Sequence, residues 1–216
     1  DPRAQSRGYG IYLNCVSHFT LEENALKGGI GFDRGIVVNE SGINSKEVRR
    51  NQVDGYFVGM TAIGVNQDYS EQGVGLLYQC NELSSSTTFN STFGNATDLF
   101  VTAGGNPNNN NNGIAQNQGD PSPTATVSAL PNNLFGNVPG RVNINNSTTS
   151  FNYFYTNSGT APEVPRLEPS NVLGNVVSQP ANSIMNSWNA ACPIAFIANP
   201  GGGIAGLQNS LSIWET

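Results

Sequence analysis

A single histidine, His18, limits the nucleophilic chemistry that this chain could perform. Acyl transfer by a serine or cysteine nucleophile needs a neighbouring imidazole that takes up the proton of the nucleophile. Cys15 lies three positions before His18. Two side chains at this spacing face opposite sides of a β-strand and share a face only on a helix. Because the surrounding residues are strand-like, we interpret His18 as a polar surface residue and predict no nucleophilic catalytic site.

Carboxylate pairs offer a second chemistry, because glycoside hydrolysis uses two carboxyl groups about 5 to 10 Å apart. Two acids stand out by their apolar neighbours, Asp33 in Gly-Ile-Gly-Phe-Asp-Arg-Gly and Asp54 in Gln-Val-Asp-Gly-Tyr-Phe. Asp33 precedes Arg34, which predicts an ion pair, and Asp54-Gly55 is a dipeptide typical of hairpin turns. We therefore predict that both acids are structural and that the chain is not an enzyme. A secreted glycoside hydrolase stays open as an alternative.

Motifs for metals and cofactors are missing from the sequence. The stretch 66–71 alternates oxygen donors but lacks the full Asp-x-Asx-x-Asx-Gly loop with its distal Glu that binds calcium. The glycine clusters at 28–31 and 201–203 are not followed by the Gly-Lys-Ser/Thr of a phosphate loop. No Cys-x-x-Cys pair occurs. We therefore predict neither a metal nor a cofactor.

The three cysteines, Cys15, Cys80 and Cys192, are widely spaced. In an oxidising compartment, an odd number leaves one thiol without a partner in the chain. Cys15 and Cys80 both lie in apolar, strand-like stretches, so Cys15–Cys80 is the predicted disulfide and Cys192 the remaining thiol. Three buried thiols that act as small hydrophobic side chains are the alternative.

Aromatic rings beside amide side chains would suit carbohydrate recognition. The stretch Phe151-Asn-Tyr-Phe-Tyr155 and Trp188, with its asparagine neighbours, supply such rings. Alternation along a strand places Phe151, Tyr153 and Tyr155 on one face. Packing in the core would explain the same alternation. A secreted carbohydrate-binding module is therefore an alternative function.

Charge is scarce and acidic in this chain. Charged residues make up 11 % of the 216 residues, and the net charge is −6. Binding to nucleic acid needs clustered Lys and Arg, whereas Arg49-Arg50 is the only adjacent basic pair, so we predict no nucleic-acid partner. Asparagine occupies 31 positions, and such an uncharged polar surface indicates an extracellular or cell-surface protein, or a virion protein.

Attached glycans are a further expectation. Five asparagines fit the acceptor pattern Asn-x-Ser/Thr, namely Asn39, Asn90, Asn95, Asn145 and Asn146. The sequence opens at Asp1 without a following apolar leader, so we expect that any leader has been removed. No apolar run reaches the roughly 18 residues of a membrane span. We therefore expect no membrane span in the mature chain.

Short apolar runs rich in Val, Ile, Phe and Tyr recur between clusters of Gly, Asn, Ser and Pro. This pattern predicts an all-β, mainly antiparallel protein, a β-sandwich or jelly roll. Short helices are expected at 20–27 and 45–53, after the capping residues Thr20 and Ser45. Since no repeat of roughly 20 to 50 residues is visible, we do not expect a solenoid. The expected strands are 10–16, 29–38, 55–65, 74–80, 87–93, 99–103, 124–130, 141–144, 150–156, 171–177, 193–198 and 210–214.

The chain is expected to form one domain. Residues 1–16 are an N-terminal segment that could be exchanged between subunits, and residues 17–216 form the β-sandwich, with long loops rich in Asn, Gly and Pro. One long polar loop is expected at 104–123, where apolar residues are almost absent.

The distribution of charge favours association between copies of the chain. Most charged residues precede Leu99, and 169–214 contains none. Because net charge keeps proteins apart, a long chargeless surface favours contact between copies. We predict an extracellular structural subunit that assembles with itself into a filament or pilus-like fibre. The expected mechanism is strand complementation, in which Ile11, Leu13 and Cys15 fill a groove of the neighbour. A virion tail or outer-shell protein is the nearest alternative.

Overall fold

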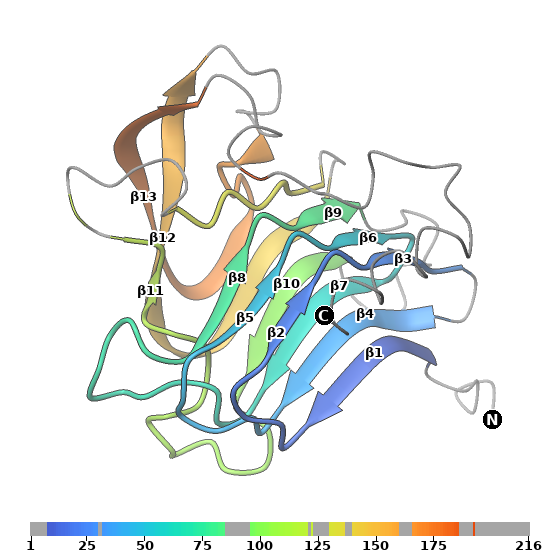
Figure 1. Cartoon of the computed structure of the whole chain (residues 1–216), viewed down its shortest axis with the longest axis vertical. Coiled ribbons are helices and arrows are strands. Elements are labelled where there is room, and N and C mark those ends of the chain that lie inside the picture. The colour runs from blue at the N-terminus through green and yellow to red at the C-terminus, as the bar shows by residue number, and fades with distance from the viewer. Residues whose placement is uncertain are drawn as a thin grey trace, which may run out of the picture.

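The computed structural model of the chain (Figure 1) describes residues 8–29, 32–84, 96–120, 122, 130–136, 140–159, 166–185 and 192. Within these ranges the chain forms β-strands and no α-helix, and hence no helix that could cross a membrane. The strands are β1 (Gly8–Asn14), β2 (Thr20–Glu22), β3 (Ala25–Lys27), β4 (Phe32–Asn39), β5 (Lys46–Arg49), β6 (Gln52–Asp54), β7 (Val58–Ile63), β8 (Leu76–Gln79), β9 (Glu82–Ser84), β10 (Thr97–Thr102), β11 (Asn117–Gln118), β12 (Val142–Gly159) and β13 (Val172–Met185).

The strands wind into a β-solenoid of about five turns. Sheet A has the strand order β1-β4-β7-β10-β12-β11, with β13 paired to β12 as well. Sheet B has the order β2-β5-β8, and sheet C the order β3-β6-β9. Each of the first three turns therefore adds one strand to every sheet, and Figure 1 shows these turns side by side. Because the chain always travels in the same direction around the coil, all paired strands are parallel.

The predicted antiparallel sandwich is thus wrong, and so are the two predicted helices. The stretch 20–27 forms β2 and β3, and the stretch 45–53 contains β5 and most of β6. Each of these strands has three or four residues and ends at a corner of the coil. Strands this short show no visible alternation, and the capping residues Thr20 and Ser45 at their start resemble helix ends in the sequence.

Most longer predicted strands are present. The stretches 10–16, 29–38, 55–65, 74–80, 99–103 and 171–177 overlap β1, β4, β7, β8, β10 and β13, and 141–144 and 150–156 both lie in β12. Those at 87–93, 193–198, 210–214 and nearly all of 124–130 lie outside the described residues. The predicted polar loop at 104–123 contains β11 and contributes buried side chains, among them Ile114, Ala115 and Gln118. Those residues take the place of a sheet B strand in the fourth turn.

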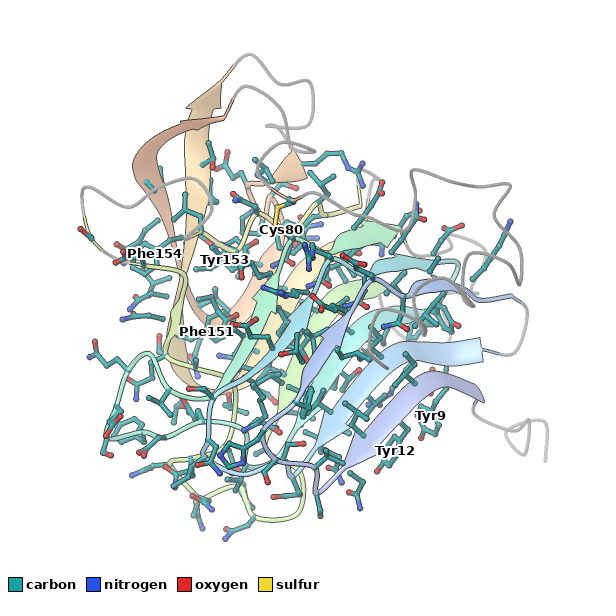
Figure 2. The ribbon with its side chains drawn as sticks, viewed as in Figure 1. Tyr9, Tyr12, Cys80, Phe151, Tyr153 and Phe154 are labelled. Carbon is teal, nitrogen blue, oxygen red and sulfur yellow. A yellow bond between two sulfur atoms is a disulfide. The ribbon has the colours of Figure 1, made fainter. Side chains whose placement is uncertain are left out.

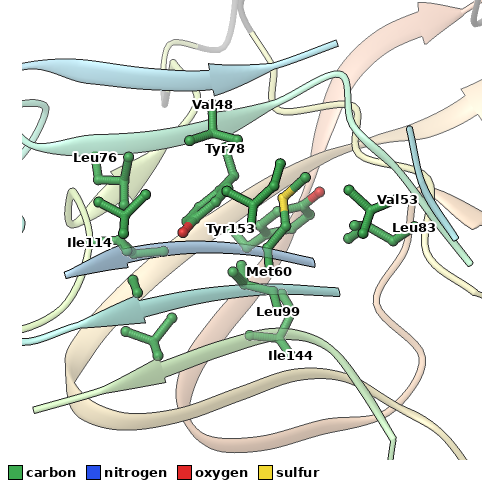
Figure 3. Packing of buried hydrophobic residues seen from close by; sticks show 14 of the residues in the cluster. Val48, Val53, Met60, Leu76, Tyr78, Leu83, Leu99, Ile114, Ile144 and Tyr153 are labelled. Carbon is green, nitrogen blue, oxygen red and sulfur yellow. The ribbon is translucent and has the colours of Figure 1, made fainter. Parts of the chain in front are cut away.

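The core is built from rows of side chains that repeat from turn to turn. In sheet A the pairing register aligns one inward-facing row through all six long strands. Neighbouring members lie about 4.8 Å apart, the spacing of paired strands. Figure 3 shows three of them, Met60, Leu99 and Ile144, on adjacent strands, with Val48 and Tyr78 packing from sheet B. The row consists of Ile11, Ile36, Met60, Leu99, Ile144 and Val172.

The corner between sheets B and C has the same construction in four successive turns. At this corner, a residue whose φ lies between 49° and 60° is followed by an asparagine. The left-handed region turns the chain sharply, and side chains other than Gly and Asn rarely adopt it. The four pairs are Glu23-Asn24, Arg50-Asn51, Cys80-Asn81 and Asn132-Asn133.

The four asparagines bond to each other along the solenoid axis. The backbone N–H and the Nδ2 group of Asn51 both donate to Oδ1 of Asn81, at 3.0 Å, and the same two groups of Asn81 donate to Oδ1 of Asn133, at 2.9 Å. Asn24 donates to Oδ1 of Asn51 in the same way. Since Asn51 and Asn81 are fully buried, the ladder satisfies polar groups that water cannot reach.

A repeat is therefore present, although none was expected from the sequence. The pattern apolar-x-x-Asn-x-apolar occurs at 21–26, 48–53, 78–83 and 130–135. Its asparagines are separated by 27, 30 and 52 residues. Loops of unequal length between the sheets change the period from one turn to the next, which hides the repeat from a search at fixed spacing.

Candidate functional site

Cys15 and His18 lie in the turn between β1 and β2, where both are exposed and both have positive φ. They therefore belong to a corner of the coil and not to a helix. The thiol of Cys15 is free, because the structure joins Cys80 to Cys192. The predicted Cys15–Cys80 disulfide is thus wrong. Cys192 is 112 residues from Cys80 in sequence, yet their Cα atoms are 5.4 Å apart, which lies within the range for a disulfide.

The two acids singled out by their apolar context have structural partners. Asp33 forms the predicted ion pair with Arg34, with 4.0 Å between Oδ2 and Nε. Asp54 ends β6 and accepts a hydrogen bond from the hydroxyl of Ser84 at 2.8 Å. Gly55, with a φ of 75°, leads the chain from sheet C to the parallel strand β7, so the expected hairpin is wrong.

A cleft lies along the outer face of sheet C, and its lining includes the charged residues Lys27, Asp54 and Glu82. Its volume is about 370 Å³. The register places Lys27, Asp54 and Ser84 in one row across three turns, and Ala25, Gln52 and Glu82 in the next row. Leu26 also lines it.

The polar groups of this cleft bond mainly to each other. Besides the Ser84 to Asp54 bond, Gln52 donates to Glu82 at 3.3 Å, and Arg166 pairs with Glu82 at 3.5 Å. Among the residues that the structure describes, no aromatic ring lines the cleft. Among the described residues, no three His, Cys, Asp or Glu side chains gather as metal ligands. Among the described residues of the cleft, Asp54 and Glu82 thus both have hydrogen-bond or ion-pair partners within the chain.

The aromatic stretch in β12 belongs to the core. Phe151, Tyr153 and Tyr155 face inward together, as alternation predicts, and Tyr153 is fully buried. Its hydroxyl oxygen accepts a hydrogen bond from Nδ2 of Asn133 at 3.3 Å, and burial raises its pKa. Figure 2 shows Phe151 and Tyr153 within the molecule. Tyr153 therefore cannot stack on a sugar, and Trp188 lies outside the described residues.

The predicted glycan acceptors have different surroundings. Asn39 ends β4, and its Nδ2 donates to Oδ1 of Asn14 at 2.6 Å, in an exposed position. Asn145 is partly exposed on β12. Asn146 is 1 % exposed and its Nδ2 donates to the carbonyl oxygens of Thr149 and Asn175, which leaves no room for a glycan in the folded chain. Asn90 and Asn95 lie outside the described residues.

Three charged side chains are buried among the described residues, Asp98, Arg141 and Lys46, and all have structural partners. Asp98, fully buried in β10, accepts hydrogen bonds from Arg141, from Nδ2 of Asn143 at 2.9 Å and from the backbone N–H of Gly136 at 3.0 Å. Burial raises the pKa of Asp98 despite the opposing effect of Arg141. Lys46 is 2 % exposed, and its ammonium donates to the carbonyl oxygens of Gly42 and Asn44 at 2.6 and 2.7 Å. Burial lowers the pKa of Lys46 to about 8.

β1 and β13 are the edge strands at opposite ends of sheet A. No described strand pairs with the outer edge of either one. Tyr9 and Tyr12 on β1 are 42 % and 48 % exposed, with ring centroids 5.3 Å apart, at the margin of the molecule in Figure 2. On β13, Leu173 and Val177 are 43 % and 46 % exposed.

The predicted subunit-contact residues lie at the β1 edge. Ile11 and Leu13 point inward and pack, partly buried, against the core of their own chain, and Cys15 follows the strand. Their role in contact between subunits stays a prediction. The position of β13 at the opposite edge of the sheet could not be expected from the sequence, because it depends on the winding of the chain.

Comparison with known proteins identifies no relative of this chain. No family model matches its sequence, and it matches neither a curated protein nor a solved structure. The functional conclusion therefore depends on the geometry described above.

Proposed function

We propose that this chain is a structural subunit of an extracellular assembly, in which copies associate through the open ends of the β-solenoid. The observation that carries the proposal is the open core of the first turn. Ile11, Leu21 and Leu26 point into the coil and are only partly buried. Their counterparts one turn later, Ile36, Val48 and Val53, are at most 1 % exposed. Another turn placed on the first one would bury these side chains as well.

Backbone groups support the same proposal. Among the described strands, β1, β2 and β3 are the edge strands of their sheets, so one side of each offers N–H and C=O groups that a further strand could pair. The exposed Tyr9 and Tyr12 on β1 and the partly buried Leu21 and Leu26 would add a hydrophobic contribution of about 25 cal/mol for each Å² removed from water. At the other end of the solenoid, β13 of sheet A is the last described strand, so a parallel contact between copies would be made through sheet A.

Stacking of intact turns differs from donation of the first strand. β1 pairs with β4 over six aligned positions, and Ile11 and Leu13 fill the core beside it. Removing β1 from its own sheet would uncover Ile36 and Val38, which are fully buried. The geometry therefore supports contact between complete turns over exchange of residues 1–16.

The test is the state of association of the whole chain. Size-exclusion chromatography with light scattering and negative-stain electron microscopy should detect species above the 22.8 kDa of one chain, growing with concentration into fibres or closed shells. Tyr12→Lys places a charge on the edge of β1 and should abolish this association, because charged residues block pairing of edge strands. Tyr69→Lys is the matched control, since Tyr69 is 50 % exposed in the segment between β7 and β8 and belongs to neither β1 nor β13. A monomer at every concentration, or equal loss in both variants, would contradict the proposal.

A further inference from the structure

We infer that copies meet head to tail, with β1 of one copy adding as a parallel strand to β13 of the next, so that sheet A continues across the junction. This inference rests on the proposed function and specifies its interface. β1 and β13 lie at opposite ends of sheet A, and every long strand between them runs in the same direction. A second copy in the same orientation therefore presents its β1 to β13 with the correct direction.

Two rows of side chains would continue across this junction. The inward-facing row begins at Ile11 and ends at Val172, and both are partly buried. The row beside it begins at Tyr12, passes through Val37, Thr61, Phe100 and Asn145, and ends at Leu173. Its two ends are exposed and apolar, at 48 % for Tyr12 and 43 % for Leu173. Pairing Ile11 with Val172 places Tyr12 against Leu173, which removes both exposed side chains from water.

Neither edge strand of sheet A carries a charged residue. β1 and β13 contain no Asp, Glu, Lys or Arg. Proteins commonly protect an edge strand from pairing with charged side chains, especially Lys. Here both edges lack that protection, and both carry exposed apolar residues, so each suits pairing with another strand.

Contact between two like ends would not continue the solenoid. Turning one copy around so that its β1 faces β1 of the other reverses the order in which sheets A, B and C follow each other around the coil. Sheet A could then meet sheet A only in antiparallel orientation, and sheet B would face sheet C. Head-to-tail contact keeps the order, and because the two surfaces differ, it can repeat without closing and yields a filament.

Cysteine cross-linking between two variants distinguishes these arrangements. One chain carries Tyr12→Cys and the other Leu173→Cys, each with Cys15→Ser to remove the free thiol. Neighbouring parallel strands are about 4.8 Å apart, which is within the Cα separation that a disulfide spans. Oxidation of the mixture should give a covalent dimer band on a gel without reductant. Each variant oxidised alone should run as a monomer on the same gel. Val177→Cys in place of Leu173→Cys is the control, since it lies four residues, or about 13 Å, out of register.

The outcomes separate the junction from the proposed function. Light scattering of the mixture before oxidation reports association itself, and Asn14→Cys with Asn175→Cys, which share the proposed register, provides a second pair. Association with a dimer of the Tyr12→Cys chain alone would indicate like ends in contact and would overturn the head-to-tail junction. Association without any cross-link from either pair would overturn it as well, while the structural function would stand. A wild-type chain that never associates would overturn both.

Discussion

Replacing Asn81 with alanine should be among the most destabilising single changes in this chain. Asn81 is fully buried in the middle of the asparagine ladder. Its Oδ1 accepts hydrogen bonds from the backbone N–H and the Nδ2 of Asn51, both at 3.0 Å. Its Nδ2 donates to the carbonyl oxygen of Val48 at 2.8 Å and to Oδ1 of Asn133 at 2.9 Å. The side chain thus joins three consecutive turns of the solenoid.

The expected magnitude follows from these four hydrogen bonds. At a net value of about 1 kcal/mol each, Asn81→Ala should lower the free energy of unfolding by about 4 kcal/mol. That is a large part of the roughly 5 to 15 kcal/mol by which most proteins are stable. For a chain of this length, the melting temperature should fall by roughly 10 °C.

Three further variants make this prediction specific to the ladder. Asn24, at the open end, donates through Nδ2 to the carbonyl oxygen of Glu22 and to Oδ1 of Asn51, but it is only partly buried, so Asn24→Ala should cost about 1 kcal/mol. Asn108 is exposed, and Asn108→Ala should change stability by less than about 0.5 kcal/mol. Asn81→Asp keeps the size of the side chain but places an oxygen against two oxygen acceptors. It should therefore be at least as harmful as Asn81→Ala.

Urea unfolding followed by circular dichroism measures these differences, with the Cys80–Cys192 disulfide intact in all variants. The reasoning would be refuted if Asn81→Ala and Asn24→Ala lost the same stability. It would also be refuted if Asn81→Asp were as stable as the wild type, because volume and not hydrogen bonding would then explain the role of the residue.

Two further predictions concern backbone packing and pH. A Cβ atom on Gly35 would collide with Cγ1 of Val53 and lie 2.5 Å from the carbonyl oxygen of Gly59, so Gly35→Ala should destabilise by about 1 to 3 kcal/mol in thermal unfolding. Gly29→Ala, where nothing lies within 4 Å of the added atom, should have little effect, and equal losses would argue against the collision. Burial lowers the pKa of Lys46 to about 8, below its value of 10.5 in the unfolded chain, so the unfolded state binds more protons between these values and stability should rise from pH 8 to pH 10. Melting temperatures of wild type and Lys46→Met across this range should differ in slope, and identical slopes would show that Lys46 stays charged in the folded chain.

Strand positions in sheet A could be predicted from the sequence, because those strands are long enough to show alternation. β4 and β7 place Ile36, Val38, Met60 and Ala62 inward at every second position. The inward facing of Phe151, Tyr153 and Tyr155 followed from the same rule. The ion pair of Asp33 with Arg34 is local, since the two residues are adjacent.

Parallel pairing could not be predicted in the same way. Alternation is identical in a parallel and an antiparallel strand with one buried face, so local pattern does not give the direction of the neighbour. The distance between equivalent asparagines, 27, 30 and then 52 residues, would have indicated stacked turns only if the positions were first aligned on the pattern apolar-x-x-Asn-x-apolar. The strands of sheets B and C have three or four residues, which is too short to show from the sequence where that alignment should begin.

The amino-acid sequence by itself determined the all-β character, the inward residues of the longer strands and the absence of charge from β1 and β13, because each of these depends on neighbouring residues in the chain. Only the tertiary structure decided the winding into turns, the Cys80–Cys192 disulfide and the position of β1 and β13 at opposite ends of one sheet. The physical reason is that these features join residues 24 or more positions apart. Their contacts depend on the lengths of the loops between them, which no local pattern specifies.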